Sequence, residues 1–585
     1  MPTPLTRRAR YLRRGLGAAL LAGAALLGAT VGGCASLPEN VQRPVSHALP
    51  PAADGALAPF ARQEGKDASA PSVAAPRTPS GFLLIDGPQA AYSSRLALAE
   101  QAQRSLDLQY YAIHADASTG RLMRAVQDAA RRGVRVRILI DDFHSAGRNA
   151  LVLGLADTPN VQIRLFNPLA GARASSLGRI LVSLGDVGRI QQRMHNKLFI
   201  ADNTLGITGG RNLGDAYFGL GEAGNFVDLD VLAAGPIVQQ MSKSFDQYWN
   251  DERAYPVESL VDRKEMDRIR EKAAESGRSG AGGGAQGTPS PPDGEPRPDA
   301  QSAAAFGDSK AAQRPGWDEQ PMDLKAVKFV WAPSLLLVDR PGKIPADEQA
   351  KEGPSPAKPD APRGEMPAGE TVVEGVLPLI AQAKQDLVIV SPYFVPGDEL
   401  RNAFAQARQR GVRIRVLTNS LASNDAPVAH VGYARHRTDL LDMGVELYEM
   451  RADQAGLRQA LGTGSGVTGG MGESKAMLHS KFIVRDGRLL AIGSMNLDLR
   501  SQKQNTEIAL VIRSPELSAE ATSIVEKSLQ EGAWKVERDS SAGGALVWRA
   551  PAGSGLQDAH TEPDTSASLR ALLWLIGPFA PDSML

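Results

Sequence analysis

The chain has 585 residues, and its 65 lysines and arginines are balanced by 65 aspartates and glutamates. With 42% hydrophobic residues, it is long enough for at least two domains with cores of their own. The neutral balance disfavours a nucleic-acid-binding protein, which would need an excess of basic residues.

The amino-terminal segment predicts an exported lipoprotein. Five arginines in the first fourteen residues precede the apolar stretch 15–33, which ends at Cys34, the one cysteine of the chain. A single cysteine excludes an internal disulfide. Residues 31–34 resemble the lipobox of bacterial lipoproteins, which implies that Cys34 is lipidated and becomes the mature amino terminus. We therefore expect a membrane-anchored protein on the periplasmic side of the cell envelope, with outer-membrane sorting permitted by Ala35; an uncleaved membrane helix is the alternative.

Composition divides the rest of the chain into two lobes and three flexible stretches. We expect a Pro- and Ala-rich tether at 35–78, a first lobe at 79–255 and a mostly disordered linker at 256–325. A second lobe at 326–540, with an internal Pro-rich segment at 340–368, and an apolar tail at 541–585 follow. The final run, 569–585, contains Trp574 and is too short to span a membrane. We expect it to dock on the core rather than to lie at the membrane interface.

An internal repeat predicts the fold class. The segment RRGVRVRILIDD (131–142) matches QRGVRIRVLTNS (409–420), and each follows an Ala-rich helical pattern. The apolar runs 106–112 and 387–395 also match and predict strands. A repeated helix, glycine and strand indicate an α/β fold made of two similar lobes, each a β-sheet flanked by helices.

The pattern His-x-Lys-x-x-x-x-Asp occurs once in each lobe. It comprises His195, Lys197 and Asp202 in the first copy and His479, Lys481 and Asp486 in the second, and we expect all six to be catalytic. Each copy is followed by a Gly-x-x-Asn extension that ends at Asn212 or Asn496. Because both copies lie in apolar, β-branched runs, we expect the histidine and the lysine on one face of a strand.

Two such units facing each other suit the transfer of a phosphorus-centred group. One histidine can attack phosphorus to form a covalent phosphohistidine, and the other can protonate the leaving alcohol and then activate the incoming one. The lysines supply the positive charge that a metal would otherwise supply, so we expect no cofactor and no metal. The amides of Asn212 and Asn496 can donate to phosphate oxygens, and Gly210 and Ser494 allow close backbone approach. We therefore expect Asn212, Ser494 and Asn496 to bind substrate.

At these residues the chain resembles the phospholipase D superfamily, over residues 80–255 and 325–540. Within it, the stretches 419–437, 444–450 and 493–510 are similar to those of bacterial cardiolipin synthases of the C type. The resemblance implies two phospholipase D-like lobes packed around one active site, with His195 as nucleophile and His479 as acid and base. Gly210 departs from the serine that is common in the family.

Several further residues are candidates for the same site. Alignment of the two motifs matches Asp228 with Glu507, and we expect these carboxylates to orient the histidines; strand-end or surface pairing with arginine is the alternative. His430 is a candidate for substrate contact. His114 and His144 are expected in loops beyond strand ends and His436 in a loop or a helix, with a plain polar role at least as well supported.

These observations predict a phosphatidyltransferase that makes cardiolipin from phosphatidylglycerol and a second phospholipid. Three alternatives stay open: hydrolysis to phosphatidic acid, a phosphodiesterase or nuclease of the same superfamily, and a binding module with an inactive site. The expected partners are a phospholipid substrate and the membrane through the lipid anchor, with no nucleic acid. The sequence leaves an accessory protein open.

Overall fold

The computed structural model describes residues 37–52, 54–62, 78–142, 152, 154–169, 187–221, 223–261, 264, 320–344, 371–453, 475–577 and 582. Several sequence predictions fall outside these ranges. They are the export signal with Cys34, His144, most of the linker 256–325 and the Pro-rich stretch from 345 onward.

The first lobe is built on a nine-stranded sheet. Its strands, in order across the sheet, are β10 (Val330–Ala332), β1 (Ser80–Ile85), β8 (Asp230–Ala234), β6 (Leu205–Gly209), β5 (Leu198–Ala201), β2 (Ser105–Tyr110), β3 (Arg135–Asp141), β4 (Val161–Phe166) and β9 (Ala254–Pro256). The β2, β3 and β4 strands are parallel, and the other pairs are antiparallel.

The second lobe is built on another nine-stranded sheet. Its strands are β11 (Ser334–Val338), β18 (Ile508–Arg513), β17 (Leu489–Gly493), β16 (Phe482–Arg485), β12 (Asp386–Val390), β13 (Arg413–Asn419), β14 (Glu446–Met450), β19 (Ala533–Asp539) and β20 (Ala545–Arg549). If the edge strands β10 and β20 are set aside, the remaining strands of the two sheets follow the same order. This order runs from β1 to β9 in the first sheet and from β11 to β19 in the second. The predicted repeat and fold class are therefore confirmed.

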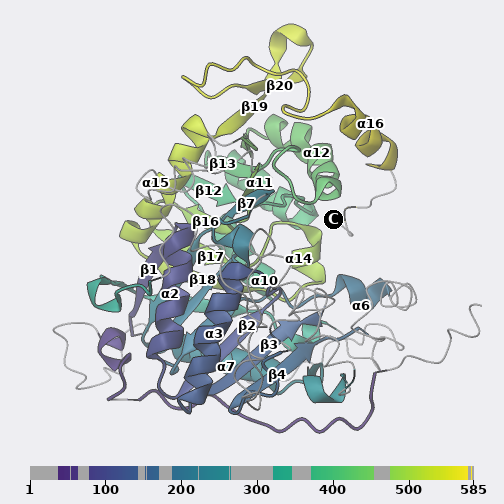
Figure 1. The fold of residues 1–585 in the computed structure, drawn as a ribbon. Coiled ribbons are helices and arrows are strands. Elements are labelled where there is room, and N and C mark those ends of the chain that lie inside the picture. The colour runs from purple at the N-terminus through teal and green to yellow at the C-terminus, as the bar shows by residue number, and fades with distance from the viewer. Residues whose placement is uncertain are drawn as a thin grey trace, which may run out of the picture.

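Equivalent helices pack against the two sheets, and Figure 1 shows the long outer helix pair of the first lobe lying over its sheet. The outer pairs are α2 (Pro88–Gln101) with α3 (Ala117–Arg131), and α10 (Val372–Ala381) with α11 (Asp398–Gln409). The inner helices are α7 (Pro236–Trp249) and α15 (Pro515–Glu531). Shorter or later helices are α6 (Val187–Gln191), α12 (Pro427–Asp442), α14 (Leu499–Lys503) and α16 (Ala567–Ile576).

The turn between helix and strand explains the glycine of the repeat. Gly133 between α3 and β3 has φ of 97°, and Gly411 between α11 and β13 has φ of 84°. A residue with a Cβ is strained in this left-handed region, so glycine ends the helix and starts the strand at both places.

One apolar cluster joins the lobes. It contains Leu198 and Val231 of the first sheet, Phe245 of α7, Leu510 of the second sheet and Leu517 of α15. Side chains from both sheets and both inner helices thus share one core, and the area they bury favours a fixed packing of one lobe on the other.

The predicted tether is more ordered than the sequence suggested. Of the stretch 35–78, residues 37–52 and 54–62 lie against the first lobe: the Arg164 guanidinium donates to the Pro44 carbonyl at 2.6 Å, and Arg137 donates to the Ser46 carbonyl at 3.0 Å. The Ala48 N–H donates to Asp246 at 2.8 Å. Buried guanidinium groups need acceptors, and this segment supplies them.

The lobe boundaries also differ from prediction. The second lobe was expected to begin at 326, yet β10 pairs with β1 of the first sheet, and β20 extends the second sheet past 540. At the start of the Pro-rich segment, Pro341–Lys343 form a 3-10 turn. None of the helices in the described parts of the chain combines the length and the apolar character needed to cross a bilayer.

Candidate active site

The two motif segments meet where the lobes face each other. His195 and Lys197 precede β5, and His479 and Lys481 precede β16, so these residues do not lie within strands as the sequence suggested. The reason is that each segment bonds to the opposite lobe. The His195 N–H donates to the Thr506 carbonyl at 2.9 Å, and the His479 N–H donates to the Val227 carbonyl at 2.8 Å.

A two-stranded parallel sheet fixes this exchange. It pairs β15 (Lys475–Leu478), directly before His479, with β7 (Gly224–Val227) of the first lobe. On the other side, Met194 forms an isolated parallel bridge with Thr506 of the second lobe. Both histidines are thereby held at the lobe interface by backbone hydrogen bonds, which define their positions more tightly than side-chain packing alone.

Each histidine hydrogen-bonds a carboxylate from the other lobe. The Nδ1 of His195 lies 2.9 and 3.1 Å from the two carboxylate oxygens of Glu507, and the Nδ1 of His479 lies 2.6 Å from Oδ2 of Asp228. A carboxylate at this position selects the tautomer in which Nδ1 carries the hydrogen. The Nε2 lone pair of each ring is then available for attack on phosphorus or for proton transfer.

Electrostatics keep both imidazoles neutral and both carboxylates ionised near pH 7. Burial, reinforced by the charge of Lys197, lowers the pKa of His195 to about 4. Burial and the charge of Lys481 lower the pKa of His479 to about 3. Burial alone would raise the pKa of Asp228, but His479 and Lys481 outweigh it and bring the pKa to about 2.

The lysines form the positive side of the site. Burial lowers the pKa of Lys197 to about 7 and that of Lys481 to about 8, and the charge of Lys481 further lowers the pKa of Lys197. Each ammonium donates to the backbone carbonyl of the histidine two residues before it. Two buried ammonium groups that disfavour each other's charge make a site in which an anion stabilises both.

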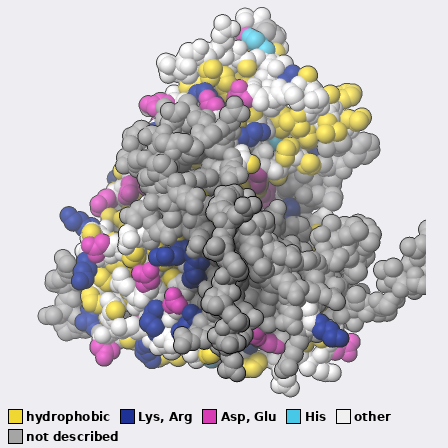
Figure 2. All heavy atoms as spheres, viewed as in Figure 1, with side chains coloured by type: hydrophobic (Ala, Val, Ile, Leu, Met, Phe, Trp, Pro, Cys, Tyr) yellow, Lys and Arg dark blue, Asp and Glu magenta, His cyan; other side chains and the backbone are white. Residues whose placement is uncertain are grey.

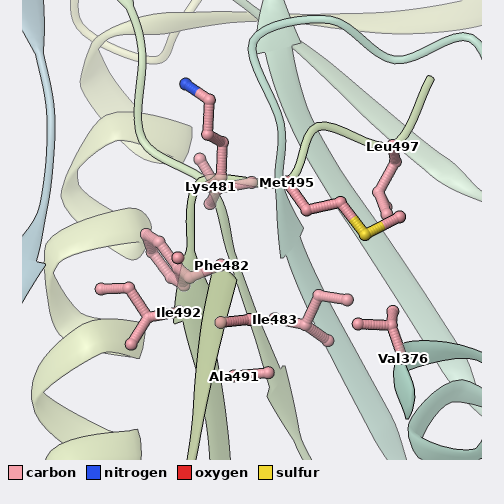
Figure 3. A pocket seen from close by; sticks show the side chains of 11 residues that line it. Val376, Lys481, Phe482, Ile483, Ala491, Ile492, Met495 and Leu497 are labelled. Atoms are coloured by element: carbon pink, nitrogen blue, oxygen red, sulfur yellow. The ribbon is translucent and has the colours of Figure 1, made fainter. Parts of the chain in front are cut away.

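Figure 3 shows how Lys481 leaves the second sheet. Its side chain points away from the apolar residues Phe482, Ile483 and Ala491. Its ammonium group donates to the His479 carbonyl. The small cavity among these apolar side chains is about 30 Å³ and cannot hold a lipid headgroup. It is a packing space behind the site.

The residue after the first glycine of each Gly-x-x-Asn extension is Gly210 in the first lobe and Ser494 in the second, and this difference has a steric reason. The Ser494 hydroxyl donates to the Glu507 carboxylate and so supports the partner of His195. A Cβ at Gly210 would lie 2.5 Å from Oδ1 of Asp228. The shorter aspartate occupies the space that a serine would need. Ser494 was predicted to contact substrate, but its hydroxyl is engaged with Glu507.

The two asparagines of the extensions are buried beside the site. The Asn212 side chain accepts from the Ala112 N–H at 3.3 Å and donates to the Tyr217 hydroxyl at 3.0 Å. Asn496 is 4% exposed, and its Oδ1 has no hydrogen-bond partner among the described residues. Contact of either amide with substrate stays a prediction.

The motif aspartates do not join the histidines. The Asp202 carboxylate accepts the backbone N–H groups of residues 103–105 at the start of β2, and Asp486 accepts those of residues 384–386 at the start of β12. Both aspartates have a positive φ, 52° for Asp202 and 53° for Asp486. Because each lies beyond the strand that follows its lysine, the expected catalytic role is replaced by a structural one: the carboxylates close turns at the far ends of β5 and β16.

The other histidines that the structure describes lie outside the motif cluster. His430 lies on α12 rather than in a loop, and its Nε2 is 3.0 Å from Arg437 and 3.3 Å from Glu562. These partners come from α12 and the tail, so its predicted substrate contact has no support in the geometry. His436 pairs with Asp582 at 2.8 Å, and the His114 ring lies 5.9 Å from that of Tyr217.

Aromatic rings surround the imidazoles, and two of them, Tyr217 and Phe226, were not singled out from the sequence. Tyr217 and Phe226 are stacked at 4.5 Å, and their ring centroids lie 5.3 and 5.1 Å from that of His479. Tyr111 lies 5.2 Å from His195. Both Tyr217 and Phe226 come from the aromatic and glycine-rich stretch 217–226, which was the available signal. Among the described residues, no three His, Cys, Asp or Glu side chains are grouped as metal ligands.

Comparison with known proteins agrees with this arrangement. A family model described as "Cardiolipin synthase, PLD-like domain" matches residues 96–249 and again 376–529. The chain is 33% identical to the Escherichia coli protein named cardiolipin synthase C over 77% of this chain and 85% of that protein. It is 30% identical to an uncharacterized Helicobacter pylori protein over 85% of this chain and 88% of that one.

A solved structure supports the fold. The phosphatidylserine synthase of Haemophilus influenzae superposes with a TM-score of 0.51 at 13% identity, over 87% of this chain and 98% of that one. The doubled motif, the two matched sheets and the family match over both lobes lead to one conclusion: this chain belongs to the phospholipase D-like cardiolipin synthase family.

Proposed function

We propose that this protein synthesises cardiolipin by transferring a phosphatidyl group to phosphatidylglycerol from a second phospholipid. The observation that supports it best is the reciprocal pairing of His195 with Glu507 and of His479 with Asp228, with one buried lysine beside each ring. Two neutral, oriented imidazoles and two ammonium groups are suited to an in-line displacement at a phosphodiester.

In the proposed first step, Nε2 of His195 attacks the donor phosphorus. The N–P bond forms as the bond from phosphorus to the headgroup oxygen breaks, and His479 gives a proton to that oxygen, so the headgroup leaves as an alcohol. The phosphodiester anion between Lys197 and Lys481 offsets their charge and raises the pKa of His479, which allows the ring to hold the required proton. The assignment of His195 as nucleophile rests on family resemblance.

In the second step, the terminal hydroxyl of phosphatidylglycerol attacks the phosphohistidine. His479 takes the hydroxyl proton, the new O–P bond forms and the N–P bond to His195 breaks, which releases cardiolipin and restores the resting site. Water in place of that hydroxyl would give phosphatidic acid by the same steps. The stacked Tyr217 and Phe226 rings beside His479 line the side from which the acceptor would approach.

Product analysis tests the reaction. Purified protein is incubated with phosphatidylglycerol, with and without phosphatidylethanolamine, and the lipids are identified by mass spectrometry. We expect cardiolipin, and a larger yield with phosphatidylethanolamine if it is the preferred donor. Phosphatidic acid as the sole product would replace synthesis by hydrolysis. No lipid product in either mixture would refute the proposal.

A trapping experiment tests the intermediate. A donor labelled in its phosphate and quenched early should leave acid-labile, base-stable label on the protein, and peptide mapping should place it on His195. Label on His479 would reverse the two roles. Turnover in EDTA is expected to continue, because the lysines supply the charge that a divalent ion supplies elsewhere.

We also propose that lipidation of Cys34 anchors the protein beside its substrate, on the periplasmic side of the envelope. The support is the position of the sole cysteine at the end of the apolar run. Cys34→Ser should abolish palmitate incorporation and shift the protein out of its membrane fraction. Unchanged labelling of this variant would eliminate the anchor.

A further inference from the structure

One face of α16 holds this helix on the second lobe. The Ser566 side chain caps the helix by accepting from the Leu569 N–H at 3.2 Å, and Leu573 is buried. Beyond the helix, the Gly577 carbonyl accepts from Arg435 of α12, and Asp582 pairs with the same arginine. The helix is therefore seated on α12, as Figure 1 shows, and is not a free tail.

The opposite face is apolar and exposed. Across the described residues, six large hydrophobic side chains are exposed, and four of them lie on α16 and at the start of α12. We call these four the α16 apolar face: Val428 (40% exposed), Leu572 (53%), Trp574 (81%) and Leu575 (62%). Figure 2 shows hydrophobic side chains gathered in this part of the surface, over α12 and α16. Such clusters mark interaction surfaces.

The α16 apolar face carries no charge of its own. Arg570 is the helix's one charged residue, and its guanidinium turns back to donate to the carbonyl and hydroxyl oxygens of Thr565. A partner held by this face would gain from burial of hydrocarbon rather than from ion pairing. Tryptophan and leucine on one side of a short helix are typical of segments that lie in the interfacial region of a bilayer.

The α16 apolar face begins at the end of α12 that is linked to the active site through Asp425. The ring of Tyr217 lies beside His479, and burial together with the charge of Asp425 raises the pKa of this tyrosine. The Asp425 carboxylate accepts from the Tyr393 hydroxyl at 2.7 Å and lies two residues before the start of α12. Val428 is on the first turn of that helix, so the apolar face begins close to the rim of the site.

We propose that α16 lies in the interfacial region of the bilayer, and that the α16 apolar face docks the mouth of the active site on the membrane that holds its lipid substrate. The choice of a bilayer as the occupant rests on the proposed function, because a phospholipid substrate must reach this rim from a membrane. This contact is separate from the proposed anchor at Cys34: the anchor limits distance from the membrane, whereas α16 sets orientation.

Fluorescence quenching by brominated lipids measures whether Trp574 enters the bilayer. Among the described tryptophans Trp574 is the exposed one. The full-length protein is reconstituted in vesicles of phosphatidylglycerol and phosphatidylcholine with brominated acyl chains. We expect quenching in the wild type that falls by at least half in Trp574→Phe. Because the anchor attaches both proteins to the vesicle, equal quenching of the two would overturn the proposal.

Activity provides the second readout. We expect Leu575→Asp to lower the ratio of activity on bilayer vesicles to activity in mixed detergent micelles on the order of tenfold, since a buried leucine side chain contributes about that much to binding. Val45→Asp is the matched control: Val45 is also exposed (70%) but lies on the amino-terminal segment against the first lobe, and neither activity should change.

The outcomes separate this inference from the function it rests on. Cardiolipin synthesis with unquenched Trp574 would refute only the docking of α16, whereas quenching without any lipid product would refute only the reaction. A dimer that forms without vesicles and dissociates in Leu575→Asp would assign the α16 apolar face to a second copy of the chain and overturn the proposal. Sedimentation of both proteins in lipid-free buffer makes that measurement.

Discussion

The two lobes repeat the same sheet, yet they hold the catalytic candidates with different pairs of residues. The first lobe provides Gly210 with the short Asp228, and the second provides Ser494 with the longer Glu507. In the first pair, the Asp228 carboxylate occupies the space that a Cβ at Gly210 would need; in the second, the Ser494 hydroxyl donates to the Glu507 carboxylate. The small residue and the carboxylate therefore differ together between the lobes, and the role of each depends on the other.

The lobes also exchange their supports. The carboxylate from the first lobe serves the histidine of the second, and the carboxylate from the second serves the histidine of the first. A duplicated chain that simply placed two half-sites side by side would keep each pair within one lobe. Because of this exchange, the pairs of histidine and carboxylate are complete only at the interface between the lobes and in neither lobe alone.

The largest effect should come from the histidines. His195→Ala and His479→Ala should each lower turnover by at least about 10,000-fold, and the double variant should lose little more, because the two rings act as one unit. Thermal unfolding should stay close to wild type, which provides the control. Near wild-type turnover in either single variant would end the two-histidine interpretation.

Exchange of the small residues should show the asymmetry. Gly210→Ser places a side chain 2.5 Å from Oδ1 of Asp228 and 2.9 Å from the His479 carbonyl, so turnover should fall about 100-fold as His479 loses its orientation. Ser494→Gly removes one hydrogen bond to Glu507 and should cost only about tenfold. Steady-state rates of both variants make the comparison, and equal losses would contradict it.

The pH dependence should distinguish the two lysines. An ammonium is charged below its pKa, so kcat/KM for an anionic phospholipid should be highest below pH 7 and should fall as pH rises through about 7 (Lys197) and about 8 (Lys481), by up to about tenfold per pH unit for each group. Lys197→Arg stays charged and should remove the first decline while lowering the absolute rate. A flat profile from pH 6 to 9 would contradict this assignment.

The smallest effect on chemistry should come from the motif aspartates. Asp202→Ala leaves three backbone N–H groups without their acceptor and should lower the free energy of unfolding by about 2 kcal/mol. Asp486→Ala should cost less, because that side chain is 18% exposed and water can replace it. Denaturant titration gives both values. A loss of kcat per folded molecule comparable to that of the histidine variants would restore a catalytic role.

Sequence patterns predicted what depends on local spacing and repetition. The helix, glycine and strand units around Gly133 and Gly411, the two sheets and the correspondence of Asp228 with Glu507 follow from periodicity and alignment. The exchange of carboxylates between the lobes could not be predicted in this way, because alignment cannot tell which lobe supplies the partner of each histidine. The position of Tyr217 against His479 also needs the folded loop, and the ordering of residues 37–62 depends on buried arginines that only tertiary structure creates.

The exchange has a consequence for how the enzyme comes into being. The contact between His195 and Glu507 joins residues 312 positions apart, and the contact between His479 and Asp228 joins residues 251 apart. Pairings of such long sequence separation form late in folding, since the cost of closing a long loop precedes any gain. A nascent first lobe emerging from synthesis has an imidazole but not its carboxylate. By this argument the His195 half of the site is complete only once Glu507, directly before β18, has packed against the first lobe.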